Sequence, residues 1–256
     1  MKKLLSLVRA AVDRYDMIDD GDKIAVGVSG GKDSLALLYA LARLRSFYPK
    51  HFEVIAITLD YRFGGMDGDY SEIQKLCDSL DVKYIVKKTD LWDVIFNIRK
   101  EKNPCSLCAK MRRGILHDTA KEYGCNKIAL GHHYDDAIGT VLMGLIYGGQ
   151  VQAMLPRVKA KNYEGMELIR PLYFTREANV VEWAEFCGLT FLPCDCPAKK
   201  LENDTKRAEI KQMIASLASI NPQIEANIFN AVKNVDTGKL LGWRDENGRH
   251  SFLDRL

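Results

Sequence analysis

The chain has 256 residues, of which 47% are hydrophobic and 28% charged, and its formal net charge is +3. This balance is typical of a globular protein and excludes a disordered chain or a collagen-like repeat. The net charge is too small to indicate a nucleic-acid partner by itself. No apolar run is long enough to cross a bilayer, and the charged, amphipathic stretch 1–22 is unlike a signal peptide. We therefore expect a cytoplasmic protein with no membrane partner.

Hydrophobic periodicity predicts helices and strands that alternate along the chain. After a first helix over 2–15, the predicted strands are 23–28, 54–59, 83–87, 127–131 and 167–169. The predicted helices that follow them are 35–44, 70–80, 109–123, 134–147 and 176–187, and two more cover 203–219 and 223–234. This alternation predicts an α/β fold with a doubly wound, mostly parallel sheet and helices on both faces. We expect an N-terminal helix over 1–20, a nucleotide-binding domain with the cysteines over 21–200, and C-terminal helices and a tail over 201–256.

A glycine-rich segment, Ser29-Gly30-Gly31-Lys32-Asp33-Ser34, follows the first predicted strand and leads into a helix. Backbone N–H groups at such a turn bind phosphate, and the helix dipole adds to the attraction. A Walker A loop is excluded because Val26 stands where its first glycine is required and Asp33 follows Lys32. A glycine turn that merely caps the helix through Asp33 or Ser34 is the alternative.

The segment resembles the PP-loop of the ATP pyrophosphatases, which cleave ATP between the α- and β-phosphates and transfer AMP to an oxygen of the substrate. The residue types of the segment suit cleavage of ATP at that position. Gly30 and Gly31 let the backbone approach the pyrophosphate, and Lys32 neutralises its charge. Ser29 and Ser34 offer hydroxyl groups. We expect all six residues to bind ATP, and we expect Asp60, at the end of the second strand, to contact the nucleotide or its Mg²⁺.

Seven cysteines are many for a chain without a secretion signal, and their odd number argues against a disulfide framework. Cys105 and Cys108 form a C-x-x-C pair, which serves zinc, redox chemistry or an iron–sulfur cluster. Cys194 and Cys196 form a C-x-C pair, and the two pairs together could supply four zinc ligands. The remaining cysteines are expected to be buried small hydrophobic residues, and they are Cys77, Cys125 and Cys187.

Further motifs follow the cysteine pair in a fixed order. They are Met111-Arg112-Arg113-Gly114-Ile115-Leu116, Ile128-Ala129-Leu130-Gly131-His132-His133-Tyr134-Asp135-Asp136, Tyr147-Gly148-Gly149, Ile169-Arg170-Pro171-Leu172, Arg176-Glu177 and Pro193-Cys194. Over about residues 15–235 the chain resembles the tRNA 2-thiocytidine synthetase family (TtcA) of PP-loop ATP pyrophosphatases. The resemblance implies a [4Fe-4S] cluster held by three cysteines. Two would be Cys105 and Cys108. The third would be Cys196, with Cys194 as the alternative, because the second group is spaced C-x-C here and C-x-x-C in the family.

The resemblance also implies an activity, namely ATP-dependent thiolation of a cytidine in a tRNA anticodon loop. The C2 oxygen would be adenylated and then replaced by sulfur held at the open iron of the cluster. Lys32, Arg112 and Asp136 would be catalytic, and Gly131 would join the ATP site. The alternative for Arg112 is a solvated helix face. The adjacent His132 and His133 are expected to line the nucleotide pocket rather than to bind metal.

Lysine and arginine gather around residues 99–113, 157–176 and 199–207, and these groups could form one track for tRNA phosphates. Tyr61, Phe63 and Tyr134 are candidates for stacking on an unpaired base. Segment 61–66 departs from the family pattern, which bears on the identity of the base or RNA more than on the chemistry. Two rival interpretations also stay open. One is a PP-loop thiolase or ligase that acts on another base or a small molecule. The other is a zinc-stabilised nucleotide-binding protein without catalysis. The resemblance suggests a homodimer, and the sulfur donor has no signal in the sequence.

Overall fold

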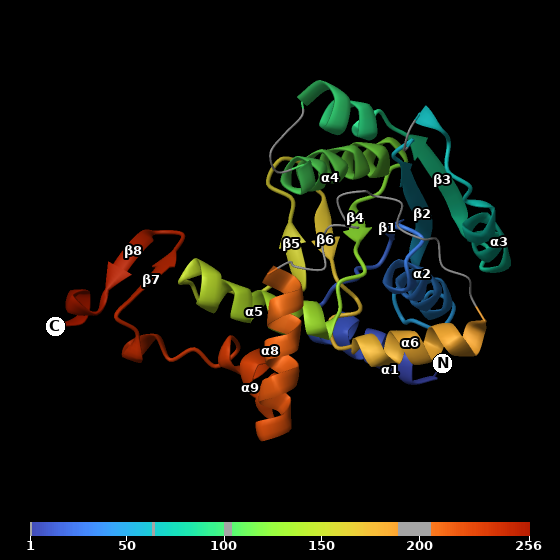
Figure 1. Cartoon of the computed structure of the whole chain (residues 1–256). Coiled ribbons are helices and arrows are strands. Elements are labelled where there is room, and N and C mark those ends of the chain that lie inside the picture. Colours follow the sequence, from blue (N-terminus) through green and yellow to red (C-terminus); the bar gives the residue numbers. More distant parts are fainter. Residues whose placement is uncertain (1, 63–64, 100–103, 189–205) are drawn as a thin grey trace. The chain divides into compact units, whose positions relative to one another are not determined.

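A computed structural model describes residues 2–62, 65–99, 104–188 and 206–256 (Figure 1). The helices are α1 (Lys2–Arg14), α2 (Lys32–Leu44), α3 (Ser71–Ser79), α4 (Pro104–Glu122), α5 (Tyr134–Gly148), α6 (Glu177–Cys187), α8 (Lys206–Ile220) and α9 (Ile224–Ala231), with a π-helix η2 (Asp93–Arg99) and 3-10 helices η4 (Thr237–Lys239) and η5 (Phe252–Arg255). The strands are β1 (Asp22–Gly27), β2 (Phe52–Asp60), β3 (Lys83–Lys88), β4 (Lys127–Ala129), β5 (Arg157–Lys159), β6 (Glu167–Ile169), β7 (Gly242–Asp245) and β8 (Gly248–Ser251). None of the helices in the described ranges is long and apolar enough to span a membrane.

The described residues form two compact units. The first comprises the residues up to Ala137 and those from Leu155 to Gly188, and it contains the whole of the larger sheet. The second comprises Ile138–Met154 and Lys206–Leu256. The boundary between the units falls inside α5, near its first turn, so that helix contributes to both.

The larger sheet has the strand order β3-β2-β1-β4-β6-β5, in which all neighbours are parallel except the edge pair β5 and β6. This confirms the predicted doubly wound, mostly parallel sheet. From β1 the chain passes to β2 on one side, and β4 later pairs with β1 on the other side. The carboxyl ends of β1 and β4 therefore frame the point where the strand order reverses, which is where such sheets bind ligands.

Helices cover both faces of the sheet (Figure 1). On one face, Leu116 and Ala120 of α4 pack with Ala25, Ile57 and Ile128 of the central strands. On the other face α2 contacts β1 and β2, and it is itself covered by α1 and α6. Because it is enclosed in this way, α2 is buried around nearly its whole circumference. Its first turn is thereby held rigidly at the end of β1.

The second unit joins α8 and α9 to the later turns of α5 and ends in a β-hairpin. Within it, the Tyr147 hydroxyl contacts the Glu209 carboxylate. The hairpin pairs β7 with β8, and its Trp243 and His250 rings stack with centroids 4.9 Å apart. The Arg255 guanidinium lies 3.9 Å from the centre of the Trp243 ring. The sequence analysis predicted the two helices and missed the hairpin.

Candidate functional site

The glycine-rich loop folds back onto the first turn of α2. Gly30 has φ +80°, a left-handed conformation that glycine adopts without strain. The Ser29 backbone N–H donates to Ser34 Oγ at 3.1 Å, and Ser34 Oγ donates to the Gly31 carbonyl at 2.8 Å. The N-cap residue Gly31 provides no side chain, and no side-chain cap forms there among the described residues. The first N–H groups of α2 therefore stay available to an anion, contrary to the capping alternative.

Lys32 is held between two carboxylates at the start of α2. Its Nζ lies 3.0 Å from Glu177 Oε1, at the start of α6, and 3.3 Å from Asp33 Oδ2. Burial disfavours the ammonium form, but the hydrogen bond that Lys32 donates to Glu177 and the charges of Asp33 and Glu177 outweigh it and raise the pKa of Lys32. The side chain is thus positively charged at the mouth of the loop, as a group that neutralises phosphate must be.

Gly131, which follows β4, lies directly against the start of α2. A Cβ atom at this position would stand 3.0 Å from the Asp33 carbonyl carbon, 3.1 Å from its oxygen and 3.2 Å from the Ser34 nitrogen. These neighbours are backbone atoms and cannot turn aside as a side chain would. The close approach requires glycine, and it places the end of β4 beside the glycine-rich loop.

The buried His133 lies between three carboxylates, close to the contact of Gly131 with α2. His133 Nδ1 lies 3.2 Å from Asp135 Oδ2 and 3.6 Å from Asp136 Oδ2, and its Nε2 lies 3.9 Å from Asp33 Oδ1. Burial disfavours the imidazolium, yet the Asp135 hydrogen bond and the charges of Asp136 and Asp33 raise the pKa of His133. This places His133 in the polar network around the loop, and its expected contribution to a nucleotide pocket stays a prediction.

The same network extends to the partner of Lys32. Asp135 Oδ2 accepts a hydrogen bond of 2.8 Å from the Glu177 backbone N–H. Although burial opposes ionisation, hydrogen bonds from His133 and Glu177 lower the pKa of Asp135. Asp136, the proposed catalytic carboxylate, accepts from the His133 backbone N–H at 3.0 Å. The glycine-rich loop, α6 and the start of α5 are thus joined by one set of charged contacts.

Asp60 has a role that the sequence did not suggest. Its side chain is buried at the end of β2, and its two oxygens accept hydrogen bonds from the Arg62 N–H at 3.0 Å, the Gly68 N–H at 3.2 Å and the Tyr70 hydroxyl at 3.1 Å. The carboxylate therefore organises the loop that follows β2. A contact with the nucleotide or with Mg²⁺ stays a prediction.

Arg170, just after β6, connects the end of β4 to helix α4. Its Nε donates to His132 Nδ1 at 3.3 Å. Burial lowers the pKa of Arg170, and the positive charge of Arg113 on α4 lowers it further. Arg113 of α4 is therefore near enough to Arg170 for their charges to repel, and Arg112 is its exposed neighbour. The predicted catalytic role of Arg112 stays a prediction.

Helix α4 begins at Pro104, five residues before the predicted start at 109, so the C-x-x-C pair lies in its first two turns. Cys105 is exposed and Cys108 is half-buried. Their spacing of three residues places them on one side of the helix. A helix N-terminus stabilises thiolate, which is the form that binds iron or zinc. The pair therefore fits a metal centre.

The other cysteines are buried, partly buried or outside the described residues. Cys77 and Cys125 are buried as predicted, and burial raises their pKa values to about 12 and about 11. Cys187, at the end of α6, is only partly buried, which corrects the prediction that it belongs to the core. Cys194 and Cys196 lie outside the described residues. Among the described residues no three His, Cys, Asp or Glu side chains gather as a metal site, so the third ligand stays a prediction.

Comparison with known proteins decides the family. The model of the PP-loop domain matches residues 3–216. A tRNA-cytidine(32) 2-sulfurtransferase from Syntrophotalea carbinolica is 36% identical over 241 residues, which cover 94% of this chain and 92% of that protein. A protein of the same name from Geobacter sulfurreducens is 36% identical over 244 residues, with 94% and 92% covered. The chain belongs to this sulfurtransferase family of PP-loop proteins.

A solved structure agrees with this assignment. The U34-tRNA thiolase NcsA from Methanococcus maripaludis, determined with its [4Fe-4S] cluster, superposes with a TM-score of 0.71 at 25% identity. The match covers 91% of this chain and 77% of that one. The resemblance stated from the sequence motifs is therefore confirmed, both for the family and for the fold.

The sequence analysis did not assign a function to two residues of the site, Glu177 and Arg170. Glu177 was noted only as part of an Arg-Glu motif, and its contact with Lys32 depends on how α6 packs against α2. Arg170 was likewise noted in a motif and grouped with the basic residues. The signal that could have found both residues was their place in motifs shared with the family that had no assigned role.

Proposed function

We propose that this chain is an ATP-dependent tRNA sulfurtransferase, which adenylates the C2 oxygen of a cytidine in the anticodon loop and replaces that oxygen with sulfur. One observation carries the proposal. The uncapped start of α2 packs against Gly131, and Lys32 beside it pairs with Glu177. The His133 ring, between Asp33 on one side and Asp135 and Asp136 on the other, links this start to the carboxylates that follow β4. A chain of this family thus has a phosphate cradle and acidic groups at one edge of its sheet.

In the first step the C2 oxygen attacks the α-phosphorus of ATP, and the bond to the β-phosphate oxygen breaks. Pyrophosphate leaves, and its charge is offset by Lys32, by the N–H groups of Gly31–Ser34 and by Mg²⁺. For this to happen Lys32 must exchange the Glu177 carboxylate for phosphate oxygens. Asp136, held by the His133 N–H, is the proposed catalytic carboxylate of the step.

In the second step sulfur bonds to C2 and the C2–O bond breaks, so AMP departs. Cys105 and Cys108 would hold a [4Fe-4S] cluster together with Cys196, or with Cys194 as the alternative. Cys105 is exposed and Cys108 is half-buried at the start of α4, which suits this role. When bound, the cluster supplies an iron without a protein thiolate, which can carry sulfide. Arg112, one helical turn beyond Cys108, is proposed to stabilise the negative charge that develops at the departing AMP.

Two measurements test the proposal. Nucleosides from a deletion strain should lack 2-thiocytidine in mass spectrometry, and loss of a different thionucleoside would favour the alternative of another base. The protein purified without oxygen should contain about four iron and four acid-labile sulfide per chain. One zinc without iron would favour a zinc-stabilised nucleotide-binding protein instead. We propose that the enzyme acts in the cytoplasm. We also propose that it is a homodimer, and light scattering of the purified protein would test this oligomeric state.

A further inference from the structure

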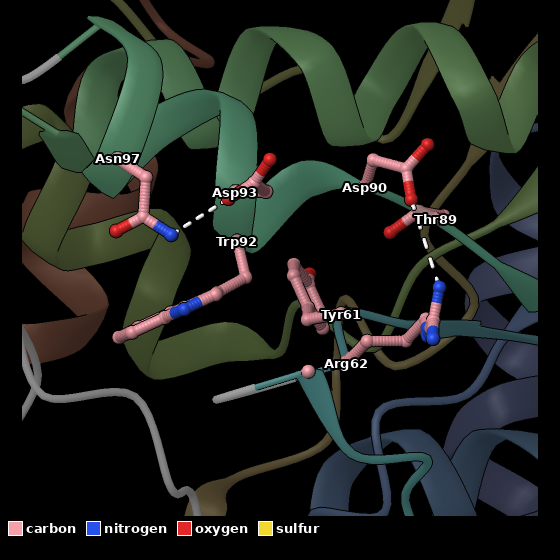
Figure 2. A pocket seen from close by; sticks show the side chains of 8 residues that line it. Tyr61, Arg62, Thr89, Asp90, Trp92, Asp93 and Asn97 are labelled. Atoms are coloured by element: carbon pink, nitrogen blue, oxygen red, sulfur yellow. Dashed lines mark hydrogen bonds and ion pairs between the residues drawn. The ribbon is translucent and has the colours of Figure 1, made fainter.

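A pocket of about 410 Å³ opens beyond the ends of β2 and β3 (Figure 2). Its lining comes from two segments, the loop after β2 and the start of the π-helix region after β3, and it consists of Tyr61, Arg62, Gly65, Thr89, Asp90, Trp92, Asp93 and Asn97. Because β1, β2 and β3 are parallel, the pocket lies at the same edge of the sheet as the glycine-rich loop. None of the residues assigned above to ATP or to the cysteine centre lines it.

The floor of the pocket is rigid. Thr89 is buried, and both its N–H and its Oγ1 donate to the Asp60 carbonyl, at 2.9 Å and 2.8 Å. The Asp60 carboxylate holds the Arg62 N–H, and Arg62 adopts φ +51°, a conformation that costs a residue with a side chain roughly 1 kcal/mol or more. The Arg62 guanidinium is fixed in turn, since its Nε lies 3.3 Å from Asp67 and its Nη1 lies 3.8 Å from Asp90.

Two aromatic rings border the hollow. Both line the pocket, and in Figure 2 they come from its two segments, Tyr61 from the loop after β2 and Trp92 from the stretch after β3. The Trp92 ring packs against Phe96 with centroids 4.4 Å apart and planes inclined by 31°. Trp92 directly precedes η2 and is thus held against Phe96 of that helix while part of its surface lines the pocket. A π-helix is rare and is frequent at functional sites.

Asp90, Asp93 and Asn97 supply hydrogen-bond acceptors to the lining. Asn97 Nδ2 donates to Asp93 Oδ1 at 2.6 Å, which orients both side chains and leaves Asn97 Oδ1 and Asp93 Oδ2 as further acceptors. The Asp90 carboxylate adds its Oδ2, since its Oδ1 faces the Arg62 guanidinium. A carboxylate accepts from the amino group of cytosine, and acceptors in general favour bases that carry amino groups over uracil, which offers a carbonyl there.

We propose that this pocket binds one unpaired, amino-bearing nucleobase of the RNA substrate, stacked against Tyr61 and Trp92 and hydrogen-bonded to Asp93 and Asn97. The inference rests on the proposed function, which requires an unpaired anticodon loop at this edge of the sheet. Proteins recognise such loops by stacking splayed bases on aromatic rings and bonding their edges. Of the other stacking candidates, Phe63 lies outside the described residues, and the Tyr134 ring carries the Arg176 guanidinium at 4.7 Å.

The test measures binding of a labelled anticodon stem–loop RNA by fluorescence anisotropy and binding of ATP by calorimetry. Tyr61→Ala and Trp92→Ala should each raise the Kd for RNA about 10-fold, the loss typical of one stacked base, and leave the Kd for ATP unchanged. Trp92→Phe should retain most of the affinity. Phe47→Ala is the matched control, because Phe47 is 51% exposed and follows the far end of α2, away from the carboxyl edge.

Asp93→Asn tests the choice of base without removing any packing, since Asp93 is exposed. The RNA panel replaces each amino-bearing loop base in turn by uridine. The wild type should bind one member of the panel more weakly than the unsubstituted RNA. For Asp93→Asn the difference in affinity between these two RNAs should be smaller. Equal RNA affinity of the wild type, Tyr61→Ala and Trp92→Ala would overturn the pocket while leaving the sulfurtransferase proposal standing. A wild type that binds no RNA would overturn both.

Discussion

Lys32 Nζ and Glu177 Oε1 are 3.0 Å apart, so the one lysine of the glycine-rich loop is engaged by a carboxylate of another helix. Both side chains are 29% exposed, which leaves the pair accessible to solvent and to a ligand. A partly exposed ion pair is weak, and a polyphosphate with its bound Mg²⁺ competes with it readily. We therefore predict that Glu177 occupies the place that a phosphate group would take beside Lys32, and its charge contributes to the raised pKa of Lys32.

Glu177→Gln should strengthen ATP binding. The amide keeps the size of the side chain and removes the charge that Lys32 must leave, so we expect the Kd for ATP to fall a few-fold in calorimetry, in line with the roughly 0.2–1 kcal/mol of an exposed pair. Lys32→Ala should instead abolish ATP-dependent AMP formation while iron and sulfide contents stay at the wild-type level. Weaker ATP binding by Glu177→Gln would show that Glu177 contributes directly to the site.

Gly131→Ala should damage the nucleotide site more than the fold. The added methyl group would meet the backbone of Asp33 and Ser34 at 3.0–3.2 Å and push the start of α2 away from β4. We expect a loss of stability of about 1–3 kcal/mol, as for other overpacked positions, and a clear rise in the Kd for ATP. Gly139→Ala is the control within α5, because its nearest neighbour outside the helix backbone is the Ile210 side chain at 3.9 Å. Denaturant melts and calorimetry would separate the two effects.

The fold was predictable because its central strands are fully buried. Such strands give continuous apolar runs, and the helices between them have a different period, so the alternation is visible in the sequence. β5, β7 and β8 were missed because they are edge strands of three or four largely polar residues. The early start of α4 was missed for a related reason, since its buried residues all lie in its second half, from Leu116 onward.

The site was predictable only where its chemistry is local in the sequence. The loop 29–34 and the C-x-x-C pair are contiguous motifs, and each could be recognised from its own spacing. The contacts of Lys32 with Glu177 and of Arg170 with His132 join segments far apart in the chain. Such contacts depend on the packing of α6 and β6, which no local pattern encodes. Only one of the two aromatic residues of the pocket was predicted from the sequence, since Tyr61 was a stacking candidate and Trp92 was not.

His133 should make stability depend on pH. Its pKa is raised in the folded state, so the folded protein binds the proton more tightly than the unfolded chain does. The resulting stabilisation is complete below the unfolded value of about 6.5 and is lost as the pH rises through the raised folded value. Thermal melts of the wild type and His133→Gln should therefore differ most below about pH 6.5 and converge at alkaline pH. A difference that grows with pH would contradict the proposed charge state.

The cysteines should separate into ligands and core residues. Cys105→Ala and Cys108→Ala should lose the iron and sulfide of the anaerobically purified protein, because both thiols lie accessible at the start of α4. Cys77→Ala and Cys125→Ala are the matched controls, since burial raises the pKa values of these thiols and keeps them from ligating metal. They should keep the full cluster and lose only some stability. Of Cys194→Ala and Cys196→Ala, the latter should lose iron, and full retention of iron by both variants would show that neither thiol is the third ligand.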